Sequence, residues 1–211
     1  MFDLGTSFLA STARDPDAIA LVDGDLRLTY AEWFARISAV ASGLSSLGMR
    51  RGQHLVSLLQ NRMEAATLHW ACQFIGVIIT PLNWRSTSEE VEYCLTDATA
   101  AAVVYEDVCA EAVAGAKSAL SIPRIRVGTP QSGEIAFSQL EAASSSSAVP
   151  RAGAEDWSLM LYTSGTTSRP KGVPRRHRME RAAAIAHVAQ NLYRRGERTL
   201  GVMPLYHTMG V

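Results

Sequence analysis

Residues 161–173 read Leu-Tyr-Thr-Ser-Gly-Thr-Thr-Ser-Arg-Pro-Lys-Gly-Val and are the most informative stretch of the chain. A short apolar run, residues 157–162, leads into six positions of which five carry a hydroxyl group. Glycines let a backbone approach a ligand closely, and a lysine adds a positive charge. Because such groups suit the oxygens of a polyphosphate, we expect a phosphate-binding loop. Its candidate cofactor-binding residues are Thr163, Ser164, Gly165, Thr166, Thr167, Lys171 and Gly172.

The loop differs from the common P-loop, which has a glycine directly before its lysine and a Ser or Thr directly after it. Here Pro170 precedes Lys171 and Gly172 follows it. The alternative is a polar surface turn, because clusters of Ser, Thr, Gly and Pro are common in turns.

The order of residues 162–173, Tyr-Thr-Ser-Gly-Thr-Thr-x-x-Pro-Lys-Gly-Val, closely resembles the phosphate-binding signature of the adenylate-forming superfamily. This superfamily comprises acyl- and aryl-CoA ligases, peptide-synthetase adenylation domains and beetle luciferases. Ser168 stands where the family usually has glycine. If that position needs a positive φ, serine costs roughly 1 kcal/mol there.

A second motif, Met203-Pro-Leu-Tyr-His-Thr-Met-Gly210, resembles the family's Pro-Leu-x-His-x-x-Gly segment beside the acyl site. By this resemblance, His207 is the candidate catalytic residue: it lines the carboxylate pocket and helps to position the substrate. A role as catalytic base does not follow from the sequence. The alternative for His207 is an exposed turn histidine at the end of a strand.

The first 140 residues alternate between strand-like and helix-like patterns, which predicts a parallel sheet with helices on its faces. The turn Asp23-Gly24-Asp25 predicts a hairpin within residues 20–30. Thr29 with Glu32, Asn61 with Glu64, and Thr87 with Glu90 are predicted to start three helices, the first of which ends at Gly48. We further expect strands at 54–59, 77–80, 101–105, 125–127, 157–162 and 199–203, and helices at 108–120 and 179–194.

The predicted fold class is therefore α/β, with a mostly parallel sheet flanked by helices. By the resemblance, it is the N-terminal portion of the large domain of an adenylate-forming enzyme, truncated after residue 211. Four consecutive serines within the Ser-rich connection at 144–156 separate an alternating subdomain, 1–143, from the phosphate-loop segment and the start of a second sheet region, 157–211. This connection is either a domain boundary or a crossing between two halves of one domain.

Composition narrows the class of protein. The 211 residues are 47% hydrophobic with a net charge of zero, which is typical of a core-forming protein. We expect no secretion signal and no transmembrane segment, and the three cysteines without metal-ligand spacing favour the cytoplasm.

Positive charge is concentrated near the C-terminus, where residues 169–198 hold nine Lys/Arg and two Glu. This basic stretch has three possible interpretations: a solvated face, a source of positive potential around a nucleotide and CoA, or a nucleic-acid-binding patch. The nucleic-acid patch is the weakest of the three, because no nucleic-acid fold signature accompanies it.

The resemblance implies an ATP-dependent acyl- or aryl-CoA ligase, with ATP, Mg²⁺ and coenzyme A as cofactors, a small carboxylate as substrate, and a role in fatty acid metabolism. The alternatives are a peptide-synthetase adenylation domain, a non-catalytic nucleotide- or phosphate-binding module and, last, a nucleic-acid-binding protein. The adenine, ribose and metal ligands and the catalytic lysine of the family follow residue 211, so we expect the chain as given to be inactive. We also expect it to pair with another copy through residues 199–211, or to be less stable than the complete protein.

Overall fold

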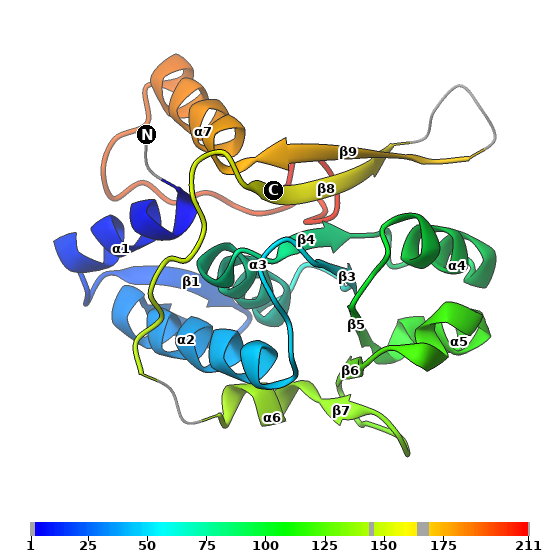
Figure 1. Cartoon of the computed structure of the whole chain (residues 1–211). Helices are drawn as coiled ribbons and strands as arrows, with labels where there is room; N and C mark the ends of the chain where they lie inside the picture. The colour runs from blue at the N-terminus through cyan, green and yellow to red at the C-terminus, as the bar shows by residue number, and fades with distance from the viewer. Residues whose placement is uncertain (1–2, 144–145, 164–168, 211) are drawn as a thin grey trace.

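A seven-stranded sheet runs through the molecule in the order β7-β6-β5-β3-β4-β8-β9 (Figure 1). The computed structural model describes residues 3–143, 146–163 and 169–210. The sheet strands are β3 (His54–Leu58), β4 (Ile78–Pro81), β5 (Ala102–Glu106), β6 (Arg124–Val127), β7 (Ile135–Ala136), β8 (Trp157–Thr163) and β9 (Lys171–Arg176). Every neighbouring pair is parallel except β8 and β9, which are antiparallel. The predicted fold class is confirmed.

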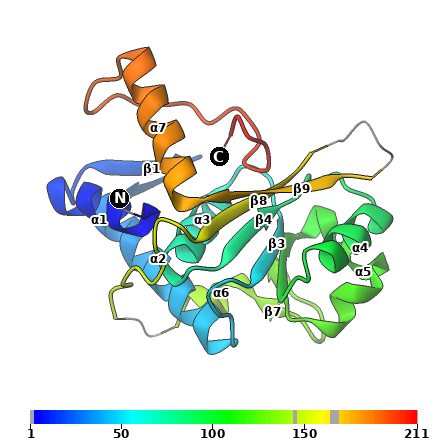
Figure 2. The same ribbon diagram turned by 45° about the horizontal axis from the view of Figure 1, so that its top comes forward.

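Helices cover both faces of the sheet, as parallel sheets require. On one face lie α1 (Leu4–Arg14), α2 (Tyr30–Ser46), α3 (Met63–Ile75) and α6 (Phe137–Glu141). On the other face lie α4 (Ser88–Asp97) and a broken helical stretch made of η1 (Asp107–Cys109), α5 (Ala110–Gly115) and η2 (Lys117–Ser121). The last helix, α7 (His177–Asn191), projects beyond the sheet near α1 (Figure 2). None of the described helices is long and apolar enough to cross a bilayer.

Local sequence signals explain several element boundaries. The predicted hairpin is present as β1 (Ile19–Asp23) and β2 (Leu26–Thr29), with Gly24 at φ +55° in its turn. Thr29 with Glu32 and Thr87 with Glu90 form complete capping boxes at α2 and α4, as predicted. Gly48 follows the end of α2 at φ +90°, a backbone conformation that favours glycine.

The predicted cap of α3 is wrong. The N-cap of α3 is Arg62, whose side chain makes no capping hydrogen bond. The carboxylate of Asp23, at the end of β1, instead accepts a hydrogen bond from the Met63 backbone N–H at 2.8 Å. A residue 40 positions earlier therefore caps this helix, and the side chain of Asn61 is used elsewhere.

Other expectations need correction near the C-terminus. Residues 199–203 do not form the expected strand and lie in irregular chain. The edge of the sheet beyond β8 is β9, because the chain turns back after residue 163 and pairs antiparallel with β8. The expected helix at 108–120 is broken into three short pieces, and the one at 179–194 begins and ends earlier, as α7.

Strand β8 lies beside β4, so the chain returns after the Ser-rich connection to the sheet built by its first half. The division into 1–143, 144–156 and 157–211 stays a prediction about folding units. The apolar exposure expected near the C-terminus is present: Leu200 is 83% exposed and Val202 is 70% exposed. Self-association through these residues stays a prediction.

Candidate active site

Two cavities lie next to one another at the carboxyl ends of β3, β4 and β8, which is the edge where parallel α/β sheets bind ligands. One has a mixed polar and apolar lining that includes hydroxyls, an imidazole and a carboxylate; we call it the polar cavity, and its volume is about 320 Å³. The other is mostly apolar, with a volume of about 200 Å³. Pro81 and Tyr206 line both of them, so the two cavities share a wall.

The polar cavity brings together predicted site residues that are far apart in the sequence. Thr163, at the carboxyl end of β8, and His207, in the C-terminal segment, both line it. The other lining residues come from the end of β4 and the loop after it, from α4, from the stems of the Ser/Thr-rich loop, and from the C-terminal segment: Pro81, Leu82, Asn83, Ser86, Glu90, Cys94, Leu161, Tyr162, Pro170, Tyr206 and Thr208. The two motifs therefore meet at one cavity.

The stems of the Ser/Thr-rich loop are paired with each other. Thr163 lies opposite Lys171 in the β8–β9 ladder, and Tyr162 lies opposite Gly172. Lys171 is exposed at the start of β9. The predicted residues Ser164, Gly165, Thr166 and Thr167, together with Ser168, lie outside the described residues.

Gly172 packs against the Met160 side chain. A Cβ atom at this position would lie 2.8 Å from the Met160 sulfur on β8, so this flexible side chain would have to move to admit one. The proposed role of Gly172 in phosphate binding remains a prediction.

Helix α4 holds both stems of the loop. The Tyr93 hydroxyl donates to the Pro170 carbonyl oxygen at 3.1 Å, and the Tyr162 hydroxyl donates to Asp97 at 2.7 Å. Tyr93 and Asp97 are four positions apart and so share one face of the helix. Sequence analysis missed both residues, because nothing in their local pattern points to a loop some 70 positions later.

Cys94 lines the polar cavity but is a poor nucleophile. Burial, followed by the nearby carboxylates of Asp97 and Glu90, raises the pKa of its thiol to about 12. The thiolate is the reactive form of cysteine, so Cys94 stays protonated at neutral pH. The cavity thus offers hydroxyls, an imidazole and backbone groups for binding, but no activated thiol.

His207 lies in a tight turn that the sequence motif explains. Its backbone N–H donates to the Pro204 carbonyl at 3.0 Å, and its own carbonyl accepts the Gly210 N–H at 2.8 Å. A Cβ atom at position 210 would lie 2.1 Å from the Pro204 oxygen, so only glycine fits there. The spacing Pro-Leu-x-His-x-x-Gly therefore specifies this turn and exposes His207 at the polar cavity.

Within the described residues, two titratable side chains line the apolar cavity: Tyr206, which it shares with the polar cavity, and His69 of α3. Its neighbours along the wall include Trp70, Ile79 and Leu205. Burial, and then the nearby His177, lowers the pKa of His69 to about 4. The imidazole is therefore neutral at pH 7 and can donate or accept a hydrogen bond inside a mostly apolar space. Sequence analysis did not single out this residue.

Comparison with known proteins confirms the family to which the chain belongs. Residues 8–211 match the family of the AMP-binding enzyme. The chain is 29% identical over 191 residues to long-chain-fatty-acid–CoA ligase FadD13 of Mycobacterium tuberculosis, a match that covers 87% of this chain and 36% of that protein. It is 30% identical over 204 residues to a feruloyl-CoA synthase of an Amycolatopsis species, covering 97% of this chain and 39% of that protein.

The fold is also found among solved structures. The N-terminal domain of FACL13 from Mycobacterium tuberculosis matches with a TM-score of 0.83 and 25% sequence identity. That match covers 98% of this chain and 52% of the other. The chain therefore spans less than two fifths of the two relatives named above and about half of this structure.

Proposed function

The chain belongs to the AMP-binding enzyme family, and from this premise we propose that the complete protein is an ATP-dependent acyl- or aryl-CoA ligase. The observation that carries the proposal is the meeting of Thr163 and His207 at one polar cavity, beside an apolar cavity suited to an acyl group. A carboxylate oxygen attacks the α-phosphorus of ATP, which gives an acyl adenylate and pyrophosphate. The CoA thiol then displaces AMP and forms the thioester.

The Ser/Thr-rich loop holds the outer phosphates in this proposal. The paired stem residues Thr163 and Lys171 fix the entrance and exit of the loop at the edge of the sheet. Lys171 stabilises the charge on the departing pyrophosphate, which is the main contribution of protein groups in phosphoryl-type transfer. Ser164, Gly165, Thr166, Thr167 and Gly172 complete the proposed set of cofactor-binding residues.

His207 orients the carboxylate at the junction of the two cavities. Its position beside Tyr206, which lines both cavities, supports this role. The acyl group then extends into the apolar cavity, where the neutral imidazole of His69 meets any polar substituent. The volume of this cavity among the described residues is about 200 Å³.

Mg²⁺ belongs to the proposal as a bridge between phosphate oxygens. Within residues 3–143, 146–163 and 169–210, no group of three or more His, Cys, Asp or Glu side chains is arranged to hold a metal ion. We therefore assign no protein ligand to Mg²⁺ among the described residues. A location in the cytoplasm and a role in fatty acid metabolism are further parts of the proposal; the relatives named above act, by their names, on both fatty and aromatic acids.

Product analysis tests the proposal. The complete protein, incubated with ATP, Mg²⁺, coenzyme A and a panel of aliphatic and aromatic acids, should form AMP and a CoA thioester with at least one acid. Formation of pyrophosphate and an acyl adenylate without a CoA thioester would favour a peptide-synthetase-type adenylation domain. Binding of pyrophosphate without turnover of any acid would favour a non-catalytic phosphate-binding module.

A further inference from the structure

The side-chain amide of Asn61 joins the β3–α3 loop to the segment that leads to His207. Its Nδ2 group donates to the carbonyl oxygens of Gly201 at 3.0 Å and Met203 at 2.8 Å. Its Oδ1 atom accepts the backbone N–H of Leu205 at 2.9 Å. Both N–H donors of the amide are therefore used, together with its oxygen, on partners 140 to 144 positions away.

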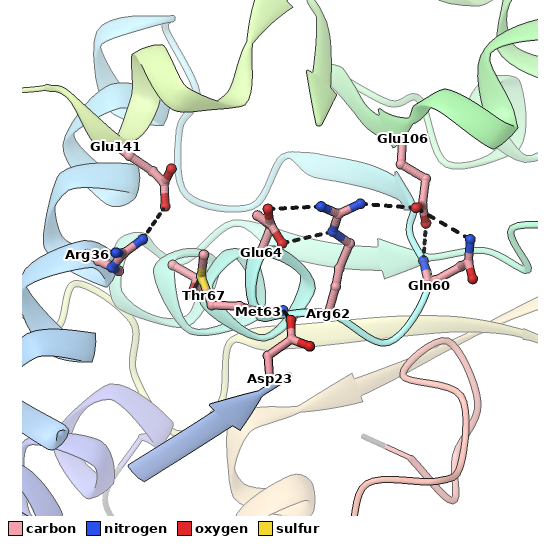
Figure 3. Close-up of polar contacts among 9 residues, drawn as sticks. All are labelled: Asp23, Arg36, Gln60, Arg62, Met63, Glu64, Thr67, Glu106 and Glu141. Atoms are coloured by element: carbon pink, nitrogen blue, oxygen red, sulfur yellow. Dashed lines mark hydrogen bonds and ion pairs between the residues drawn. The ribbon is translucent and has the colours of Figure 1, made fainter. Parts of the chain in front are cut away.

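The loop that carries Asn61 is fixed on both sides (Figure 3). On one side, the Gln60 backbone N–H donates to the buried Glu106 carboxylate at the end of β5. On the other side, Arg62 donates to the same carboxylate at 3.1 Å and to Glu64 at 2.8 and 3.0 Å. The neighbours of Asn61 are thus tied to the sheet and to α3.

The segment that Asn61 holds has little regular structure of its own. Residues 197–202 form neither helix nor strand, and Leu200 and Val202 are largely exposed. Other backbone hydrogen bonds in this part of the chain join near neighbours, such as Val202 N–H to Leu200 O at 3.0 Å. A segment with few apolar contacts and exposed backbone opens easily unless specific hydrogen bonds restrain it.

We propose that Asn61 is a positioning residue that sets the place of the His207 turn at the polar cavity. The Oδ1 atom of Asn61 accepts the N–H of Leu205, and Leu205 lies inside the turn that the hydrogen bond from His207 N–H to Pro204 O closes. Because both residues belong to this one turn, fixing the position of Leu205 also fixes the position of His207. Asn61 does not line either cavity and touches no substrate in this proposal. The consequence for catalysis rests on the function proposed above, whereas the restraint itself does not.

Amide hydrogen exchange on the 211-residue chain tests the restraint without any activity. In Asn61→Ala, the Leu205 amide should exchange roughly 5- to 10-fold faster, which corresponds to the loss of one ordinary hydrogen bond. Gln60→Ala is the matched control, since it removes an amide one position away that does not reach residues 201–205, and its Leu205 exchange should equal that of the wild type. In Asn61→Asp, a carboxylate oxygen replaces the Nδ2 group and faces the carbonyl oxygens of Gly201 and Met203, which repel it, so Leu205 exchange should rise at least as much as in Asn61→Ala.

An unchanged Leu205 exchange rate in folded Asn61→Ala would overturn the proposal. Asn61 is exposed, so the alanine variant should fold. If it does not, the isosteric Asn61→Asp variant is used instead. Exchange rates equal to those of the wild type at Leu205 and in the segment 201–203 of that variant would also overturn the proposal.

Kinetics of the complete enzyme test the consequence for catalysis. Asn61→Ala should slow adenylation or raise the KM for the carboxylic acid by roughly 10-fold or more, the effect expected when a positioning contact is lost. Thioester formation from a supplied acyl adenylate should change less than about 3-fold, because the carboxylate no longer needs to be oriented. Faster Leu205 exchange with unaltered adenylation would refute the role in catalysis but keep the restraint. If the wild type shows no adenylation at all, the proposed function fails, while the exchange experiment still decides the restraint.

Discussion

Tyr162 donates its hydroxyl to the Asp97 carboxylate, with 2.7 Å between the two oxygens, and thereby joins β8 to the last turn of α4. The burial of Tyr162, and then this hydrogen bond, raises the pKa of its phenol, so the hydroxyl stays protonated and remains a donor. With the Tyr93–Pro170 hydrogen bond, this contact fixes both ends of the Ser/Thr-rich loop to one helix.

Replacing Tyr162 should loosen one stem of the loop. Tyr162→Phe removes the hydroxyl and keeps the ring, so we expect the free energy of unfolding to fall by about 0.5–1.5 kcal/mol. In the complete enzyme, the same change should raise the KM for ATP more than the KM for the acid. Urea unfolding and initial-rate kinetics measure the two effects. Tyr93→Phe is the matched variant for the other stem, and a larger effect on the acid than on ATP in both variants would contradict this assignment.

Removing the charge of Lys171 should affect the first half-reaction more than the second. In the proposed mechanism, Lys171 meets the outer phosphates, which leave as pyrophosphate before the thioester forms. Loss of a charge-assisted contact costs about 1.5–3 kcal/mol, so Lys171→Ala should slow adenylation by roughly 10- to 150-fold. Thioester formation from a supplied acyl adenylate should stay near the wild-type rate. Equal losses in both half-reactions would show that Lys171 acts through folding or at another site.

His69 should make the chain less stable in mild acid. Its pKa is about 4 in the folded state, and an unperturbed histidine titrates near 6.5. As the pH falls from about 6.5 towards 4, the unfolded state binds a proton that the folded state does not bind, so folding stability decreases. Because His69 is partly exposed at the apolar cavity, we expect a loss of about 1–2 kcal/mol, less than full burial would give.

Urea unfolding at pH 7.5 and at pH 5.0 measures this loss. In His69→Gln, which cannot titrate in this range, the difference between the two pH values should be smaller than in the wild type. His54 also has a lowered pKa because of its burial and remains in both proteins, so it serves as an internal reference. An identical pH dependence in the variant would show that His69 titrates normally.

Local signals in the sequence predicted the elements that depend on neighbouring residues. The capping boxes of Thr29 and Thr87 were correct because each box needs only four consecutive positions. The alternating apolar segments gave the parallel sheet for a similar reason. The predicted N-cap at Asn61 was wrong, although it rested on the same kind of local pattern. The side-chain amide of Asn61 forms hydrogen bonds with residues 201–205, and a carboxylate distant in the sequence, that of Asp23, caps the helix.

For the candidate site too, the sequence predicted residues that belong to local motifs but not residues that act through contacts between distant segments. The motifs led to Thr163 and His207, and the fold brings both residues to one cavity. The supporting residues Tyr93, Asp97 and His69 could not be found in this way, because their roles arise only when α3 and α4 pack beside strands from other parts of the chain. The expected strand at 199–203 was wrong for a related reason: its apolar pattern suits a strand, but β9 already occupies the edge beside β8.

The central claim is that Thr163 and His207 belong to one adenylate-forming site, and ATP–pyrophosphate exchange tests it most directly. The complete, folded protein should exchange labelled pyrophosphate into ATP only when a suitable carboxylic acid is present. The His207→Ala variant should show less of this exchange, and the 211-residue chain alone should show none. Acid-dependent exchange across a panel of aliphatic and aromatic acids is the predicted result. No exchange with any acid, or exchange that does not depend on the acid, would contradict the account.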